Sequence, residues 1–135
     1  MNKAFASIVA AAFALSSTAF AGDNYKMELK APPSAKKGEK AAAKIHVEGT
    51  GEFHMNLEFP AKLTVEAPTG VTLDKAKQTR RDAVKFEKSG ADFAIGFISE
   101  DTGKKSFKGE FKFAVCTDNN CSPTTEKIAF DVNVN

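Results

Sequence analysis

Two cysteines are the side chains of this protein best suited to covalent chemistry. Cys116 and Cys121 enclose residues 117–120 and lie between two stretches in which apolar and polar residues alternate. A tight turn between such stretches can bring two α-carbons within about 7 Å, which is close enough for a disulfide. Because disulfides persist in exported proteins, we expect these cysteines to be bonded to each other if the chain leaves the cytoplasm.

The expected disulfide suits two different roles. As a clamp on a hairpin, a bond closing a loop of about six residues would stabilise the fold by about 2 kcal/mol, at the low end for disulfides. As a redox-active pair, it would be open to attack by a partner thiolate, because exposed disulfides are the exchangeable ones. Asp118 lies between the cysteines, where its carboxylate would either repel a thiolate or assist exchange by sharing a proton. Metal binding by the two thiols is a third alternative.

The wider segment around the cysteines, residues 111–123, reads FKFAVCTDNNCSP and precedes a final alternating stretch. A Cys-x-Asp motif begins the loop at Cys116 and Asp118, and Pro123 follows closely after Cys121. This arrangement resembles the N-terminal periplasmic domain of DsbD-type thiol:disulfide interchange proteins. Such a resemblance favours the redox-active role over the clamp.

The resemblance implies a fold, a reaction and a class of partner. The fold is an immunoglobulin-like sandwich with both cysteines on a late hairpin, and residues 54–60 also resemble the middle of related small exported proteins. The reaction is thiol–disulfide exchange with thioredoxin-like or other exported thiol proteins, and it needs no cofactor. Cys121 would attack the partner, Cys116 would resolve the mixed disulfide and Asp118 would tune protonation. The alternative is a non-catalytic interaction or structural domain whose disulfide only pins the last hairpin.

The two histidines offer a weaker case for a metal site. His46 and His54 could join Met55 or the cysteines around copper, because imidazole and thioether ligands suit that metal. Both histidines, however, fall on the polar phase of their alternating stretches, which is typical of surface residues. No zinc-ligand spacing is present either, so we predict no metal site.

The first 21 residues have the order of a secretory signal. Lys3 supplies the positive charge, residues 4–15 are apolar except for one serine, and Ala19-Phe20-Ala21 provides the small residues that a signal peptidase accepts. The apolar run is shorter than the about 20 residues needed to cross a bilayer, and no later run is longer. We predict cleavage after Ala21 and a single domain, residues 22–135, in the periplasm or outside the cell.

The composition narrows the choice of partners. The chain has a formal net charge of only +2, which argues against a nucleic-acid-binding protein, since those show a strongly basic face. It has 12 phenylalanines and no tryptophan. Phenylalanine has no polar tip to satisfy, so those beyond the signal are predicted to pack in a core.

Apolar and polar residues alternate with a period of two along most of the chain, and turn signals interrupt the pattern every ten residues or so. The alternating stretches are residues 25–29, 41–47, 53–59, 63–65, 71–73, 84–86, 93–97, 107–115 and 128–134. Segment 74–84 lacks an apolar stripe and is expected to be a charged connection. Together with the resemblance, the pattern predicts an all-β, immunoglobulin-like antiparallel β-sandwich of about seven to nine short strands. Charged outer faces favour a monomer.

Overall fold

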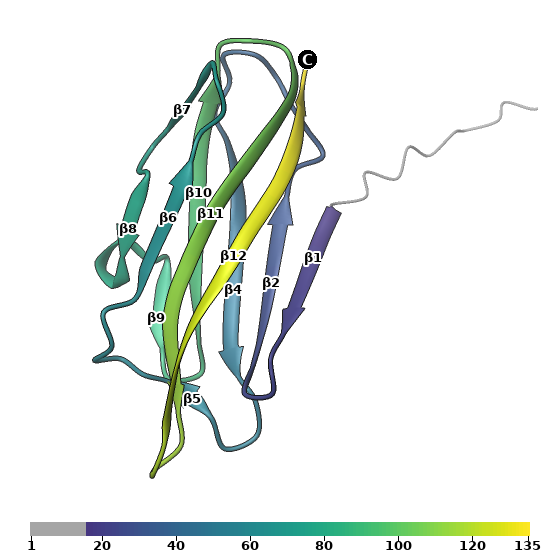
Figure 1. Cartoon of the computed structure of the whole chain (residues 1–135). Coiled ribbons are helices and arrows are strands. Elements are labelled where there is room, and N and C mark those ends of the chain that lie inside the picture. Colours follow the sequence, from purple (N-terminus) through teal and green to yellow (C-terminus); the bar gives the residue numbers. More distant parts are fainter. Residues whose placement is uncertain (1–15) are drawn as a thin grey trace, which may run out of the picture.

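The computed structural model describes residues 16–135, so most of the predicted signal lies outside the described residues. Nearly all regular structure in residues 16–135 is β-strand (Figure 1). The strands are β1 (Ser16–Ala21), β2 (Tyr25–Ala31), β3 (Ser34–Ala35), β4 (Ala41–Gly49), β5 (His54–Met55), β6 (Lys62–Glu66), β7 (Val71–Leu73), β8 (Lys77–Thr79), β9 (Lys85–Glu87), β10 (Gly90–Ser99), β11 (Gly103–Cys116) and β12 (Cys121–Val134). A short 3₁₀ helix, η1 (Arg80–Asp82), follows β8.

The strands form two sheets that pack face to face, which confirms the predicted β-sandwich (Figure 1). Sheet A has the order β1-β2-β4-β10-β7, with β9 also paired to β10. Sheet B has the order β3-β12-β11-β6-β8, with β5 also paired to β11. All pairings are antiparallel except the short one between β3 and β12. The longer strands account for most of the alternating stretches. The short strands β5, β7 and β9 lie in the stretches 53–59, 71–73 and 84–86, while β3 and β8 were not expected.

Phenylalanine rings fill the space between the sheets, as their abundance predicts. Those with at most 8% of their surface exposed are Phe93, Phe97, Phe107, Phe111, Phe113 and Phe130. Phe93 of sheet A meets Phe111 of sheet B edge to face, with ring centroids 5.1 Å apart. Because each buried aromatic ring removes a large apolar area from water, this layer supplies much of the stability of the fold.

The β11–β12 hairpin is the longest element and carries the cysteines to one end of the sandwich. Each strand has 14 residues. The two strands stay in register from Gly103 opposite Val134 to Cys116 opposite Cys121. The tip of this hairpin projects at the lower end of the molecule in Figure 1, beyond the ends of the neighbouring strands.

Two stretches fold differently from expectation. Only His54 and Met55 of residues 53–59 form a strand, because the backbone turns sharply after Asn56. Segment 74–84 is not only a connection, since it contains β8, which pairs with β6, and η1. Gln78 explains this strand: its side chain points inward, is 4% exposed, and donates a hydrogen bond from Nε2 to the Ala94 carbonyl at 2.8 Å.

The strand β1 lies inside the predicted signal. It pairs with β2 along six residues, from Ser16 opposite Ala31 to Ala21 opposite Lys26, and Phe20 packs against the core. The predicted cleavage after Ala21 would remove this strand and leave β2 at the edge of sheet A. Within residues 16–135 there is no helix long and apolar enough to cross a membrane.

Candidate functional site at the hairpin tip

The two cysteines form the disulfide that their spacing predicts. Cys116 is the last residue of β11 and Cys121 is the first residue of β12, so the bond joins the two strands directly across the end of the ladder. Their environments differ: Cys116 is 5% exposed, whereas Cys121 is an exposed residue. This difference favours approach of an incoming thiolate from the Cys121 side of the bond.

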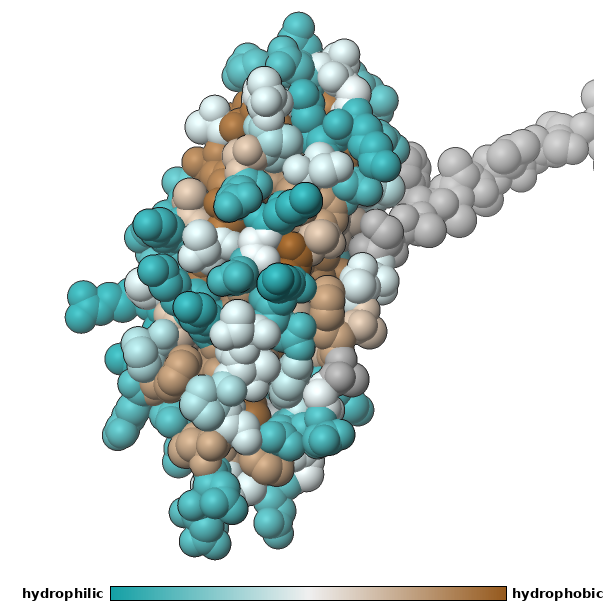
Figure 2. All heavy atoms as spheres, viewed as in Figure 1, coloured by the Kyte–Doolittle hydropathy of each residue, from teal (hydrophilic) through white to brown (hydrophobic). Residues whose placement is uncertain are grey.

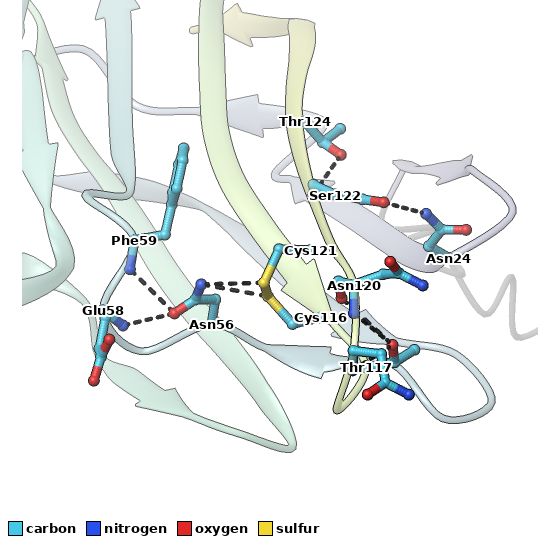
Figure 3. The surroundings of a disulfide bond; sticks show 11 residues. Asn24, Asn56, Glu58, Phe59, Cys116, Thr117, Asn120, Cys121, Ser122 and Thr124 are labelled. Atoms are coloured by element: carbon cyan, nitrogen blue, oxygen red, sulfur yellow. Dashed lines mark hydrogen bonds between the residues drawn. A yellow bond between two sulfur atoms is a disulfide. The ribbon is translucent and has the colours of Figure 1, made fainter.

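Hydrogen bonds also stabilise the turn between the cysteines. The Thr117 amide donates to the Asn120 carbonyl at 2.7 Å. The Thr117 hydroxyl oxygen accepts from the amides of Asn119 and Asn120 at 3.3 Å and 3.1 Å. Next to the turn, the Asn24 amide group donates to the Ser122 hydroxyl at 2.9 Å (Figure 3). These hydrogen bonds stabilise the turn in addition to the disulfide.

The side chain of Asn56 reaches the disulfide from the loop after β5 (Figure 3). Its Nδ2 lies 3.3 Å from Sγ of Cys116 and 3.8 Å from Sγ of Cys121. Its Oδ1 accepts hydrogen bonds from the amides of Glu58 and Phe59 at 2.9 Å and 3.2 Å. Because the oxygen is used by these two backbone donors, the NH₂ group is the end of the amide that faces the sulfur atoms.

Backbone contacts fix the loop that carries Asn56. The strand β5 pairs with the end of β11, with His54 opposite Cys116. The Met55 amide donates to the Lys88 carbonyl at 2.9 Å, and the Asn56 amide donates to the Ala114 carbonyl at 2.9 Å. Met55 itself is fully buried. The hydrogen-bond donor is thus positioned by the sheet and by the core.

Asn56 was not among the residues singled out from the sequence. One sequence signal could have identified it. In the short segment that ends at Pro60, the side-chain oxygen of an asparagine can accept hydrogen bonds from the backbone amides two and three residues later, which favours a turn. The Asn56 side chain lies close to the cysteines only because β5 pairs with the end of β11, and these two strands are far apart in the sequence.

Asp118 lies in the exposed turn between the cysteines, as its position in the sequence requires. Within residues 16–135, no hydrogen bond or ion pair of the Asp118 carboxylate to a cysteine or to Asn56 is found. The proton-tuning role that the family resemblance implies for Asp118 therefore stays a prediction.

The histidines lie apart from each other. His54 is beside the disulfide on β5, while His46 is on the outer face of sheet A. The His46 ring contacts Asp92 Oδ1 through Nδ1 at 2.5 Å and Glu48 Oε2 through Nε2 at 3.3 Å. Partial burial lowers the pKa of His46, but its hydrogen bonds to Asp92 and Glu48 and the charges of these carboxylates outweigh this effect and raise it. In the described part of the chain, no cluster of three or more His, Cys, Asp or Glu residues could hold a metal ion.

Two packed, mainly antiparallel sheets define a β-sandwich domain, and a solved structure shows the same immunoglobulin-like fold. The GAE domain of GGA2p from Saccharomyces cerevisiae is similar over 85% of this chain and 97% of its own, with a TM-score of 0.51 and 10% identity. AggA, the major subunit of aggregative adherence fimbriae type I from Escherichia coli, aligns over 89% of this chain and 96% of its own, with a TM-score of 0.44 and 5% identity. No protein-family model and no curated protein matches the chain. The similarity to the GAE domain, at 10% identity, shows the fold alone.

Proposed function

We propose that this protein is an exported thiol–disulfide exchange module that acts through Cys116 and Cys121. One observation carries the proposal: the exposed Cys121 and the buried Cys116 share a disulfide, and a fixed amide N–H of Asn56 lies 3.3 Å from the buried sulfur. The exposed sulfur can receive a nucleophile, and the buried sulfur, next to a donor, is suited to leave. The resemblance to DsbD-type N-terminal domains supports the same choice of Cys121 as the cysteine that forms the mixed disulfide with the partner.

The exchange takes place in two displacement steps with a thioredoxin-like dithiol as the partner. A partner thiolate attacks Cys121 Sγ, the Cys116–Cys121 bond breaks, and its electron pair goes to Cys116 Sγ as a thiolate. The Asn56 N–H donates a hydrogen bond to that developing negative charge. The second thiolate of the same partner then attacks the partner sulfur of the mixed disulfide, and Cys121 leaves as a thiolate. The partner is oxidised to a disulfide, and the two cysteines of this protein are reduced and take up protons from solvent.

The competing function is that of a non-catalytic domain with a structural clamp, and the disulfide at the end of the longest hairpin is compatible with it. Two features favour exchange over the clamp. The turn is already held by the hydrogen bonds of Thr117, and the short loop gives the bond little stabilising effect through the unfolded chain. An amide N–H that faces the sulfur atoms would also stabilise the thiolate formed when the bond opens.

The Asn56→Ala variant tests the proposal. Hydrogen bonds to charged groups contribute about 1.5–3 kcal/mol, so losing the donor to the leaving thiolate is expected to slow reduction of the disulfide by about tenfold or more. The rate is measured by stopped flow with a thioredoxin-like dithiol protein and, separately, with dithiothreitol. Asn24→Ala is the matched control, because Asn24 contacts the same hairpin through Ser122 and not through sulfur. Equal rates for wild type and Asn56→Ala would contradict the proposed mechanism.

A further inference from the structure

The outer face of sheet B carries a concentration of positive charge over a shallow hollow. The hollow is lined by Lys62, Thr64, Glu66, Lys77, Lys108, Gly109, Glu110, Lys112 and Lys127. Five lysines against two glutamates give this patch an excess of three positive charges, more than the +2 of the whole chain. Hydrophilic side chains gather over the middle of this face, across β6, β11 and β12 (Figure 2).

Within the described residues, the lysines of this hollow form no close ion pairs, although two of them stand opposite glutamates. Lys108 faces Glu66 on β6, and Lys127 on β12 faces Glu110. In residues 16–135, none of the five lies within 4.0 Å of a carboxylate, although six other lysines do. Lys62 and Lys112 stand directly opposite each other on β6 and β11. Like charges in such cross-strand pairs destabilise a sheet, and an anion bound between them would remove the repulsion.

The positive surface continues beyond the first hollow and forms a track across the strands. Lys112 on β11 is opposite Lys62 on β6, and Lys62 is opposite Thr79 on β8. A second hollow then joins Lys62 to Arg80 and Arg81, which directly follow Thr79. Lys112, Lys62 and the two arginines therefore follow one another across the strands, a shape that fits an extended anionic chain better than a small anion. We call these four basic residues the basic track; they are Lys62, Arg80, Arg81 and Lys112.

The opposite face of the sandwich, the outer face of sheet A, has no comparable excess of positive charge among its described residues. On sheet A, Lys30 and Lys44 also stand opposite each other, but Glu28 lies 3.6 Å from Lys30. The same face carries the acidic residues Glu48 and Asp92 around His46. The positive excess therefore belongs to sheet B and is not a general property of the surface.

We propose that the basic track binds a linear acidic polysaccharide through ion pairs with its carboxylate or sulfate groups. Two other polyanions fit less well. Single-stranded nucleic acids stack successive bases on several aromatic rings, whereas the residues around the two hollows include one ring, the half-buried Phe59. Insertion into a membrane surface needs exposed apolar side chains, and the one large exposed hydrophobic residue found in residues 16–135, Val84, lines a hollow on sheet A instead.

Affinity measurements on surface variants test this proposal. Heparin oligosaccharides and polygalacturonate serve as sulfated and carboxylated probes, and neutral dextran is the blank. Wild type is expected to bind both acidic polymers, with an affinity that falls as salt screens the ion pairs. The Lys62→Gln/Lys112→Gln variant is expected to bind about five- to tenfold more weakly, because two charges leave the track. The matched control, Lys30→Gln/Lys44→Gln, removes the same charge from sheet A and is expected to bind as wild type does.

Four outcomes would overturn the proposal. They are no binding of either acidic polysaccharide, an equal loss of affinity in both double variants, tighter binding of single-stranded DNA of matched charge, and tighter binding of anionic phospholipid vesicles. The check on folding is that neither variant unfolds at a lower temperature than wild type, since all four lysines are exposed. The test does not depend on the cysteines, so its outcome is independent of the exchange reaction.

Discussion

A Cys116→Ser variant is expected to accumulate a mixed disulfide through Cys121, and a Cys121→Ser variant is expected to accumulate none. The reason is access to the sulfur. Cys121 is exposed at the start of β12, whereas Cys116 is 5% exposed and lies beneath the Asn56 side chain. In the first variant the attacking thiol is present and the resolving thiol is missing. In the second, the one remaining thiol is shielded from a protein partner.

The measurement uses a thioredoxin-like protein that has a single active-site cysteine, supplied as a mixed disulfide with 5-thio-2-nitrobenzoate. Attack by the free thiol releases the coloured leaving group, and non-reducing electrophoresis detects the joined proteins. A small disulfide reagent provides the control, because it can reach a partly buried thiol that a protein cannot. Equal reaction of both variants with the protein partner would show that the assigned direction of attack is wrong.

Truncation of the core is expected to destabilise the protein more than loss of the disulfide. Phe111 is fully buried and meets Phe93 across the two sheets, so Phe111→Ala should lower the free energy of unfolding by about 3–5 kcal/mol. Reduction of the disulfide should lower it by about 2 kcal/mol at most, because the bond closes a short loop. A protein whose disulfide opens during its function must remain folded in the reduced state, and this ranking allows it.

Urea unfolding with and without dithiothreitol measures both effects on the same scale. Phe111→Leu is the conservative control, since it keeps most of the apolar volume and should cost less than the alanine variant. A loss on reduction as large as that caused by Phe111→Ala would support the clamp and count against exchange.

The parts of the structure that depend on local pattern could be predicted from the sequence. Alternation identified the long strands, and the spacing of Cys116 and Cys121 identified the disulfide, because both are set by residues close together in the chain. The abundance of phenylalanine likewise indicated what fills the core. Each of these inferences rests on a periodicity or a spacing that is set by local chain geometry and does not depend on how the strands are connected.

The parts that depend on distant contacts could not be predicted. In residues 53–59 apolar and polar residues alternate as in a strand. However, Asn56 Oδ1 accepts hydrogen bonds from the two backbone amides that a strand would pair with its neighbour, and a turn forms instead. The same side chain reaches the sulfur atoms only because β5 pairs with the end of β11. The facing of Lys62 and Lys112 also depends on strand pairing, which no local pattern specifies.

The redox equilibrium of the Cys116–Cys121 pair tests the exchange function most directly. The folded protein is equilibrated with a thioredoxin-like dithiol in buffers of defined potential, the thiols are trapped by alkylation, and the reduced fraction is read by mass. Exchange predicts rapid equilibration and a midpoint above about −300 mV, within the range of redox-active pairs. A pair that stays oxidised below about −300 mV and does not react with the dithiol protein would contradict the exchange function and leave the disulfide as a structural clamp.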